Sequence, residues 1–187
     1  MNQQVHDLII TNGTLATHET SEAVDIAITD GRFAALGGVS AEQGREHIDA
    51  TGLTILPGVI DTQVHFREPG IEHKEDLQSG SLAAVMGGVT GVFEMPNTKP
   101  PTTTAEAVED KVARATNRMH CDFAFYVGGT HENAAELPKL EKMTGVCGVK
   151  VFMGSSTGNL LVPDDDGVAD ILKSIRRRAA FHSEDEF

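Results

Sequence analysis

Cysteine is scarce in this sequence. Its two cysteines, Cys121 and Cys147, both lie in apolar, strand-like segments. A framework of disulfide bonds is therefore not expected, and two small core residues in a reducing compartment are the better interpretation.

Basic residues are also few, with 15 Lys and Arg against 28 Asp and Glu, which gives a formal net charge of −13. This balance argues against nucleic acids and anionic membrane surfaces as partners, because both attract clusters of Lys and Arg. The basic cluster Arg176–Arg178 falls at the end of an expected helix, where positive charge suits the helix dipole. We interpret this cluster as structural.

Long hydrophobic runs are absent. No run approaches the roughly 20 apolar residues of a membrane-spanning helix. The N-terminus MNQQVHDLII lacks the basic segment and apolar core of a signal peptide. The 187 residues, 40% of them hydrophobic, are instead typical of a globular protein, and a cytoplasmic location is expected.

Residues 1–52 predict the first half of a small flanking β-sheet domain. Short apolar runs, DLIITNGTLA and AVDIAITDGRFAALG, are interrupted at Asn12-Gly13 and Asp30-Gly31. An Asp-Gly pair between two alternating apolar runs is a strong signal for a β-hairpin.

Residues 53–187 alternate between strand and helix patterns. Threonines precede the second expected helix as candidate N-caps, and Pro138 is expected to interrupt the third. The strands are continuous apolar runs, as in a parallel sheet that is covered on both faces. Strands are expected at residues 53–66, 89–96, 121–129, 148–154 and 179–185, and helices at residues 74–88, 103–119, 132–143 and 163–178.

This alternation predicts an α/β fold of right-handed βαβ units, either an open sheet or a (β/α)8 TIM-type barrel. A barrel needs eight strands and about 250 residues, whereas the sequence accounts for five strands. We therefore predict the N-terminal part of a (β/α)8 barrel, truncated after about its fifth strand. Since an apolar strand at the end of the chain would leave an unpaired edge, we expect a fragment of a longer protein.

Polar residues gather at the carboxyl ends of the predicted strands, where a parallel barrel builds its active site. His65 and Arg67 follow the first strand, Asn97 follows the second, Lys150 lies within the fourth and His182 ends the fifth. Single histidines are usually structural, and Asn97 also suits a turn. Lys150 is harder to dismiss, because burial within an apolar run would favour its neutral amine. Of the remaining histidines, His131 is expected at a helix start, and His18, His47, His73 and His120 are expected in solvent.

A second pattern precedes His65 in the stretch LPGVIDTQVHFREPG. Strand side chains alternate, so Asp61, Gln63 and His65 are expected on one face. Two histidines so placed would form a metal clamp, but glutamine occupies one of the two places.

The motifs HFREPG, EMPNTKP, GVKVFMGSSTG and AFHSEDE resemble those of dihydroorotases, within the cyclic amidohydrolase family, and the resemblance runs from about residue 50 to the last residue. HFREPG followed by MPNT is expected to separate dihydroorotases from allantoinases and hydantoinases. The resemblance implies the interconversion of N-carbamoyl-L-aspartate and (S)-dihydroorotate in pyrimidine biosynthesis, by a zinc-dependent hydrolase.

The resemblance also implies roles for single residues. His65 and His182 would ligate zinc, and Lys150 would be catalytic as a carboxylated lysine that bridges two zinc ions. Arg67 and Asn97 would hold the substrate carboxylate, a task that suits the planar guanidinium. Asp61 would be a weak metal ligand or would orient a neighbouring group.

Gln63 departs from the family pattern, which has histidine there. A glutamine carbonyl is a weaker zinc ligand than imidazole, so one of two metal positions should bind less tightly or stay empty. The resemblance further implies a histidine from the sixth strand and an aspartate general base from the eighth, both of which would lie beyond residue 187. The alternative hypothesis is a non-catalytic homologue that acts as a scaffold for aspartate carbamoyltransferase. A homo-oligomer is expected in either case.

Overall fold

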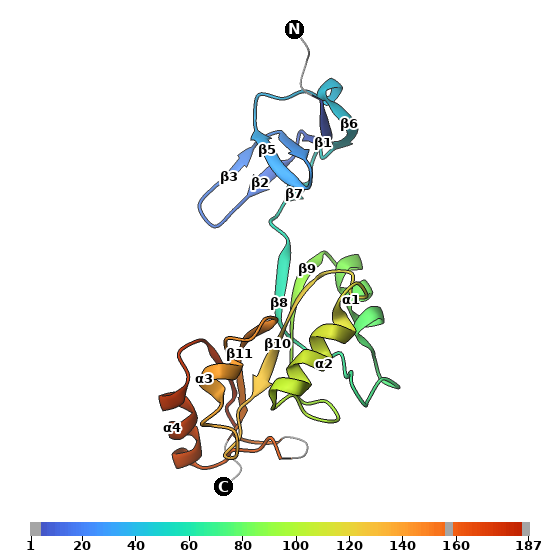
Figure 1. Cartoon of the computed structure of the whole chain (residues 1–187). Helices are drawn as coiled ribbons and strands as arrows, with labels where there is room; N and C mark the ends of the chain where they lie inside the picture. Colours follow the sequence, from blue (N-terminus) through green and yellow to red (C-terminus); the bar gives the residue numbers. More distant parts are fainter. Residues whose placement is uncertain (1–4, 156–158, 185–187) are drawn as a thin grey trace. The chain divides into compact units, whose positions relative to one another are not determined.

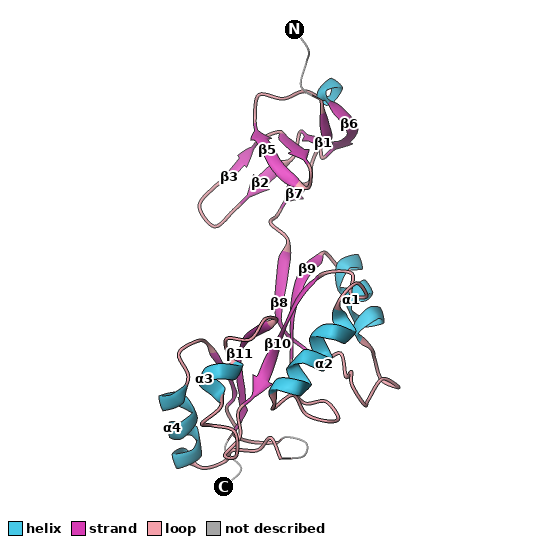
Figure 2. Cartoon of the chain, in the orientation of Figure 1, coloured by secondary structure: helices cyan, strands magenta, loops and turns pink. Residues whose placement is uncertain are grey.

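The computed structural model describes residues 5–155 and 159–184 and divides the chain into two compact units, residues 1–57 and residues 58–187. Figure 1 shows the elements of both units, and Figure 2 separates the strand-rich first unit from the second unit, which contains the α-helices. Each unit is described by itself.

The first unit holds two small sheets. The first sheet contains β1 (His6–Thr11), β4 (Ile26–Thr29), β5 (Arg32–Leu36) and β6 (Gly44–Asp49) in the order β5-β4-β1-β6, with a short 3-10 helix (Ala41–Gln43) before β6. The second sheet contains β2 (Thr14–Ala16), β3 (Ser21–Ala23) and β7 (Thr54–Ile55) in the order β3-β2-β7.

The predicted hairpin at Asp30-Gly31 is confirmed, since β4 and β5 pair antiparallel across it. Both turn residues have positive φ angles, 51° for Asp30 and 67° for Gly31. Two consecutive positive φ values are typical of the type I′ turn, whose twist matches that of the flanking strands.

The prediction of a single strand over residues 53–66 is wrong. The structure has two strands there, β7 in the first unit and β8 (Val59–Val64) in the second. Pro57 lies between them, and proline has no backbone N–H with which to continue a strand ladder. The first unit therefore extends to Pro57, past the predicted boundary at residue 52.

The second unit contains a parallel sheet whose five strands lie in sequence order. They are β8, β9 (Val89–Glu94), β10 (Asp122–Gly128), β11 (Val146–Phe152) and β12 (Ala179–His182). Right-handed crossovers between sequential parallel strands put all the connecting helices on one face, as in the first part of a barrel. The predicted α/β class and the five parallel strands are confirmed.

Four helices connect these strands: α1 (Leu77–Met86), α2 (Ala105–Ala115), α3 (Leu137–Leu140) and α4 (Asp165–Ser174). Three of them begin at side-chain caps. Asp76 accepts a hydrogen bond from the Ser79 backbone at 2.7 Å, Thr104 caps α2 as its threonines predicted, and Asp164 caps α4. Such caps satisfy backbone N–H groups that the first helical turn leaves open.

The third helix is shorter than expected. Only Leu137–Leu140 of the predicted range 132–143 is helical, and Pro138 lies in its first turn. Proline fits that turn, but it cannot sit inside a longer helix, because it has no N–H and clashes with the preceding turn. Pro138 therefore starts the helix and does not interrupt it.

The basic cluster Arg176–Arg178 lies beyond the end of α4, which is at Ser174. The cluster was expected to interact with the end of the helix, and only Arg176 does so. The Arg176 guanidinium donates to the carbonyls of Lys173 and Ile175, both at 2.7 Å, and Arg177 donates instead to the carbonyls of Glu141 and Val146. The cluster is structural, as interpreted, but it mainly ties the α4–β12 loop to the segment before β11.

The core of the second unit lies between the sheet and the helices. Every residue of β11 is buried, as its apolar run predicts, whereas β8 is an exposed edge strand. Phe66, Leu77 and Phe125 belong to a buried cluster that includes residues of both α1 and α2. Both cysteines are free thiols, as expected. Among the described residues, none of the helices is long and apolar enough to cross a membrane.

Candidate functional site

His65 and Asn97 meet at the carboxyl ends of β8 and β9. His65 comes directly after β8, and its Nδ1 lies 2.8 Å from Asn97 Oδ1. An amide oxygen can only accept, so Nδ1 carries the proton and Nε2 keeps its lone pair. Burial lowers the pKa of His65, the Asn97 hydrogen bond opposes this, and the charges of Arg67 and Lys150 lower the pKa further. The neutral imidazole that a metal requires is therefore favoured.

Lys150 is buried within β11, with 4% of its surface exposed. Its Nζ lies 4.8 Å from the centroid of the Phe152 ring. Within the part of the chain that the structure describes, the amine has no hydrogen bond and no ion pair. Burial lowers the pKa of Lys150, which favours the neutral amine as the sequence predicted.

His182 ends β12 and is partly exposed. Its Nε2 lies 2.9 Å from a carboxylate oxygen of Glu184, and its ring centroid is 6.1 Å from that of Phe152. Phe152 thus contacts both Lys150 and His182, and the described residues show no direct contact between those two.

Arg67 adopts the left-handed conformation, with a φ of 63°. Its neighbours on both sides, Phe66 and Glu68, are buried. Glu68 accepts hydrogen bonds from Arg118 at 2.6 Å and from the Leu77 backbone at 3.1 Å. A bulky residue in this region of φ is uncommon and is held there by its surroundings. The Arg67 side chain itself forms no ion pair among the described residues.

Asp61 lies on the exposed edge strand β8. The pairing of β8 with β9 shifts register between Asp61 and Val64, so the alternation expected from Asp61 to His65 is interrupted. Asp61 Oδ1 instead accepts a hydrogen bond from the Gln63 backbone at 2.9 Å, and both residues are exposed. Within residues 5–155 and 159–184, no group of three His, Cys, Asp or Glu side chains could hold a metal ion.

The other histidines fall partly where the sequence placed them. His18, His47, His73 and His120 are exposed, as expected. His131 does not start a helix. It lies in the turns before α3, and its Nε2 is 2.9 Å from Asp164, the residue that caps α4.

The sequence analysis missed a buried ion pair next to the site. Glu94 is the last residue of β9, and Lys111 lies on α2. Lys111 is fully buried, Glu94 is 1% exposed, and the Lys111 amine donates to Glu94 Oε2. Burial raises the pKa of Glu94 and lowers that of Lys111, and each partner's charge opposes the shift of the other. Glu94 interrupts the apolar run VTGVFEMP just as Lys150 interrupts GVKVFMG, which was the available signal.

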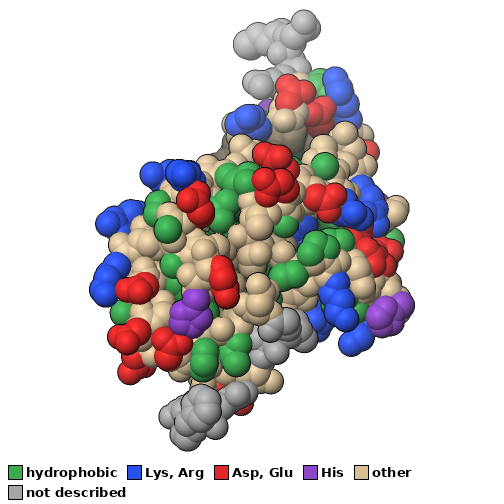
Figure 3. All heavy atoms as spheres, turned by 60° about the horizontal axis from the view of Figure 1, so that its bottom comes forward, with side chains coloured by type: hydrophobic (Ala, Val, Ile, Leu, Met, Phe, Trp, Pro, Cys, Tyr) green, Lys and Arg blue, Asp and Glu red, His purple; other side chains and the backbone are tan. Residues whose placement is uncertain are grey.

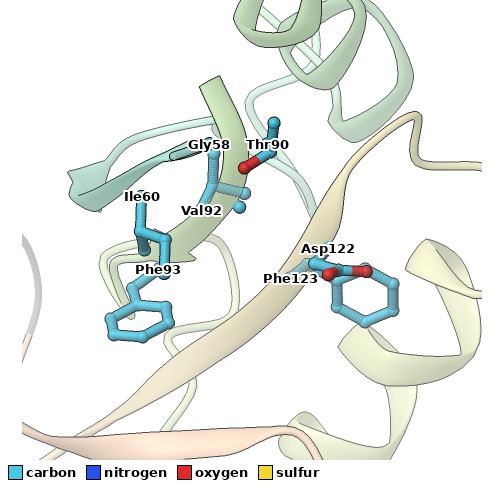
Figure 4. A pocket seen from close by; sticks show the side chains of 8 residues that line it. Gly58, Ile60, Thr90, Val92, Phe93, Asp122 and Phe123 are labelled. Atoms are coloured by element: carbon cyan, nitrogen blue, oxygen red, sulfur yellow. The ribbon is translucent and has the colours of Figure 1, made fainter. Parts of the chain in front are cut away.

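A pocket of about 210 Å³ is lined by residues of β9, by the beginning of β10, and by Gly58 and Ile60 at the start of β8. Figure 4 shows Ile60 and Phe93 on one side of it and Asp122 and Phe123 on the other. On β8 and β10 the lining residues come from the starts of the strands, on β9 they reach Phe93, and none of the predicted site residues lines the pocket. The face turned forward in Figure 3 carries acidic and basic side chains close together, with apolar patches between them.

Comparisons with known proteins place the chain among cyclic amidohydrolases. The family model Dihydro-orotase-like matches residues 52–152. An allantoinase from Rubrobacter xylanophilus is 40% identical over 166 residues, which cover 88% of this chain and 35% of the relative. A dihydroorotase from Methanosarcina mazei is 34% identical over 184 residues, which cover 96% of this chain and 40% of the relative.

A solved structure gives the same result for the fold. The L-hydantoinase from Arthrobacter aurescens superposes with a TM-score of 0.89 and 31% sequence identity, over 97% of this chain and 42% of the hydantoinase. The chain thus spans between a third and somewhat over two fifths of the relatives it matches. The prediction of a (β/α)8 TIM-type barrel fold, present through its first five strands with flanking β-sheets, is confirmed.

The expectation that HFREPG and MPNT single out dihydroorotases is not supported, because allantoinases and dihydroorotases are both among the relatives. The coarser assignment is firm, since all these relatives are cyclic amidohydrolases and the family model covers more than half of the chain. The chain belongs to the dihydroorotase-like family of cyclic amidohydrolases.

Proposed function

We propose that the whole protein is a metal-dependent dihydroorotase, which interconverts N-carbamoyl-L-aspartate and (S)-dihydroorotate. The observation that carries this proposal is the position of Arg67 beside the His65–Asn97 pair, with no ion pair of its own in the described chain. Dihydroorotate bears a carboxylate next to its cyclic amide, whereas allantoin and hydantoin bear none. An unpaired guanidinium beside the expected metal site therefore favours the charged substrate.

Asn97 supports the same choice of substrate. Its Oδ1 accepts from His65, so its amide NH2 remains to donate a hydrogen bond. A guanidinium and an amide donor together can hold a carboxylate in one orientation. This orientation would fix the ring of dihydroorotate relative to His65.

The side chains suit a zinc site in which part of the ligand set is present. His65 has a free Nε2, His182 offers a second imidazole, and Lys150 is buried without a charged partner. A neutral lysine in a dry site is the form that can be carboxylated. Zinc bound there would lower the pKa of a water molecule and polarise the amide carbonyl of the substrate. Gln63 offers a weaker zinc ligand than the histidine that the family pattern has at this position, and a single occupied metal position is therefore proposed.

The test is turnover by the whole protein of dihydroorotate, allantoin and hydantoin, measured together with its zinc content. Dihydroorotate should be the preferred substrate. Arg67→Met should lower kcat/KM for dihydroorotate by about 100-fold, since removing one partner of a charge pair costs a few kcal/mol. Equal turnover of allantoin, with no effect of Arg67→Met, would contradict the assignment of the substrate.

Lys150→Ala should abolish this activity, and Lys139→Ala provides the matched control, because Lys139 is an exposed lysine on α3. Activity that survives Lys150→Ala would remove Lys150 from the mechanism. The control variant should behave as the wild type.

A second candidate function is that of a non-catalytic scaffold for aspartate carbamoyltransferase. The observation that favours it is the glutamine at position 63, together with the exposure of Asp61. A scaffold would bind no zinc, would turn over none of the three substrates and would co-sediment with the transferase. Zinc binding with turnover would exclude it. The homo-oligomeric state stays a prediction, to be measured in the same sedimentation experiment.

A further inference from the structure

A buried ion pair lies directly behind the proposed site, and the proposed chemistry does not use it. Lys111 is the largest fully buried side chain of the described residues, and its partner Glu94 is almost as inaccessible. Neither residue is a proposed metal ligand or substrate contact. The pair needs an explanation, because burying two charges is costly.

Stability alone is a poor explanation. A buried ion pair is often no better for stability than apolar residues of similar volume, even when it is well satisfied. This pair is not fully satisfied, because Glu94 Oε1 has no hydrogen-bond partner, a condition found for no other buried side-chain nitrogen or oxygen in the described part of the chain. An unpaired buried oxygen costs free energy.

The contacts of the pair lead to the backbone segments that carry the site. The Lys111 amine donates to the carbonyl of Met95 at 3.0 Å as well as to Glu94. The Met95 amide in turn donates to the carbonyl of Val64 at 3.0 Å. The Phe66 backbone acts to lower the pKa of the Glu94 carboxyl, against the larger effect of burial. Val64 and Phe66 flank His65, and Met95 stands two residues before Asn97.

A second set of contacts ties the other side of Arg67 to the same helical segment. Glu68 accepts a hydrogen bond from Arg118 at 2.6 Å, and Arg114 approaches it at 3.6 Å. Arg114 lies three residues after Lys111 on α2, a spacing that places side chains on one side of a helix, whereas Arg118 lies in the turn three residues beyond the end of α2. Helix α2 and this turn thus contact the end of β9 through Lys111, and Glu68, the neighbour of Arg67, through Arg114 and Arg118.

We propose that the Glu94–Lys111 ion pair is a positioning device that locks the His65–Arg67 segment to the Asn97 loop. It keeps His65 against Asn97 and keeps the Arg67 guanidinium beside them. The proposal rests on the proposed function only for the identity of the residues that are positioned. Its structural part can be tested without any catalytic activity.

The experiment is amide hydrogen exchange, followed by mass spectrometry, on this chain and on the double variant Glu94→Gln/Lys111→Met. The variant replaces the two charges by a neutral isostere and an apolar side chain of similar length. Exchange in residues 64–70 and 95–99 should accelerate by about 10-fold or more, while exchange in β10 and β11 stays unchanged and the midpoint of thermal unfolding stays close to that of the wild type.

The matched control is Asp170→Asn/Lys173→Met, which removes an exposed ion pair on α4. It should leave both segments unchanged. Should the Glu94→Gln/Lys111→Met variant fail to fold, Glu94→Leu/Lys111→Met replaces both charges by apolar side chains, leaves no unpaired buried polar group and should give the same local acceleration. Unchanged exchange in the two segments, or equal acceleration throughout the sheet, would overturn the positioning role.

In the whole protein, the same double variant separates positioning from general damage. It should lower kcat/KM for dihydroorotate about 10-fold more than for an uncharged ring such as dihydrouracil, because only the former uses Arg67. An equal loss for both would assign the pair a purely structural role. The absence of any turnover in the wild type would instead defeat the proposed function and leave the exchange result standing.

Discussion

Two lysines of the second unit are buried, and their surroundings assign them different tasks. Lys111 has a carboxylate partner and a backbone carbonyl, so its charge is compensated. Among the described residues, Lys150 has the face of the Phe152 ring as its one recorded partner, which offers weaker compensation. A neutral amine is a nucleophile towards carbon dioxide, whereas a paired ammonium is not. The proposed carboxylation therefore suits Lys150 better than Lys111, for which we propose the positioning role.

A single substitution tests whether position 63 belongs to the metal site. Gln63→His should raise the amount of zinc bound per chain, because imidazole is a stronger zinc ligand than an amide oxygen. Thr62→His is the control, since it adds the same group one residue away on the alternating strand. Zinc measured by inductively coupled plasma mass spectrometry after dialysis should rise only for the first variant. An equal rise in zinc content for both variants would show that position 63 does not belong to the metal site.

Residue by residue, the sequence was informative where a polar side chain interrupts an apolar strand. Lys150 was recognised in this way, and its burial is confirmed. Glu94 fitted the same rule, but its partner Lys111 is 17 residues away on a helix, a distance that strand alternation cannot bridge. The register of β8 shifts after Asp61, and such a bulge has no signature in the alternation of residue types.

At the scale of elements, two loops cross beside the site, and Gly70 lies where they touch. The Lys99 amide donates to the carbonyl of Pro69 at 2.9 Å. Gly70 has a φ of +89°, and a Cβ added there would stand 2.1 Å from the carbonyl oxygen of Lys99. The loop that follows β8 and the loop that follows β9 therefore need glycine at this position.

Gly70→Ala should lower the free energy of unfolding by about 2–4 kcal/mol, from left-handed strain together with the clash. Gly88→Ala is the matched control. Gly88 also has a positive φ, +86°, but a Cβ there would meet nothing within 4 Å, so that only the strain of about 1–2 kcal/mol is expected. Urea denaturation of both variants measures the difference, and equal losses would contradict the close approach of the loops.

Glu68 predicts a pH dependence for the loop that carries Arg67. Burial alone would raise the pKa of Glu68, but the hydrogen bonds from Arg118 and from the Leu77 amide bring the pKa below its ordinary value of 4.5. A lowered pKa means that the stabilisation is fully present above about pH 4.5 and disappears as the pH falls through the lowered value. Glu68→Gln should therefore cost about 1–3 kcal/mol at pH 7 and much less at pH 3.

The control for this pH dependence is Glu109→Gln, on an exposed position of α2. The difference in unfolding free energy between each variant and the wild type is measured by urea denaturation at the two pH values. A loss for Glu68→Gln that is the same at pH 7 and pH 3 would show that the ionised carboxylate is not what holds the loop.

Among the elements, strands and capped helices were predictable from the sequence, and α3 was not. The caps Asp76, Thr104 and Asp164 are local signals, since the side chain and the amide that it accepts from lie three residues apart. The extent of α3 depends instead on how residues 131–136 pack beside the sheet, for which Pro138 gives only a boundary. The break at Pro57 was likewise hidden, because β7 finds its partner in the first unit.

At the scale of the whole molecule, sequence order was enough to predict the arrangement of the second unit. Alternating strand and helix patterns allow few topologies once crossovers are right-handed, and a sequential parallel sheet is one of them. The order β8 to β12 is the one found. The choice of substrate within the family could not be predicted in the same way, because cyclic amidohydrolases share the fold and differ in the few side chains that meet the ring.

The second unit exposes apolar side chains that predict self-association of this chain. On α1, Met86 is 80% exposed, and Leu82 and Val85 are also exposed. The edge strand β8 exposes Val59 and Ile60 and has a free side for hydrogen bonding among the described residues. Sedimentation velocity over a range of concentrations should therefore detect association of the chain.

Leu82→Gln/Met86→Lys should lower the association constant by 10-fold or more. A loss of about 1.4 kcal/mol, on the order of two buried methylene groups, corresponds to a factor of ten. Leu172→Gln, which removes a similarly exposed leucine on α4, should leave association unchanged, and equal effects of the two variants would show that α1 is not the surface involved.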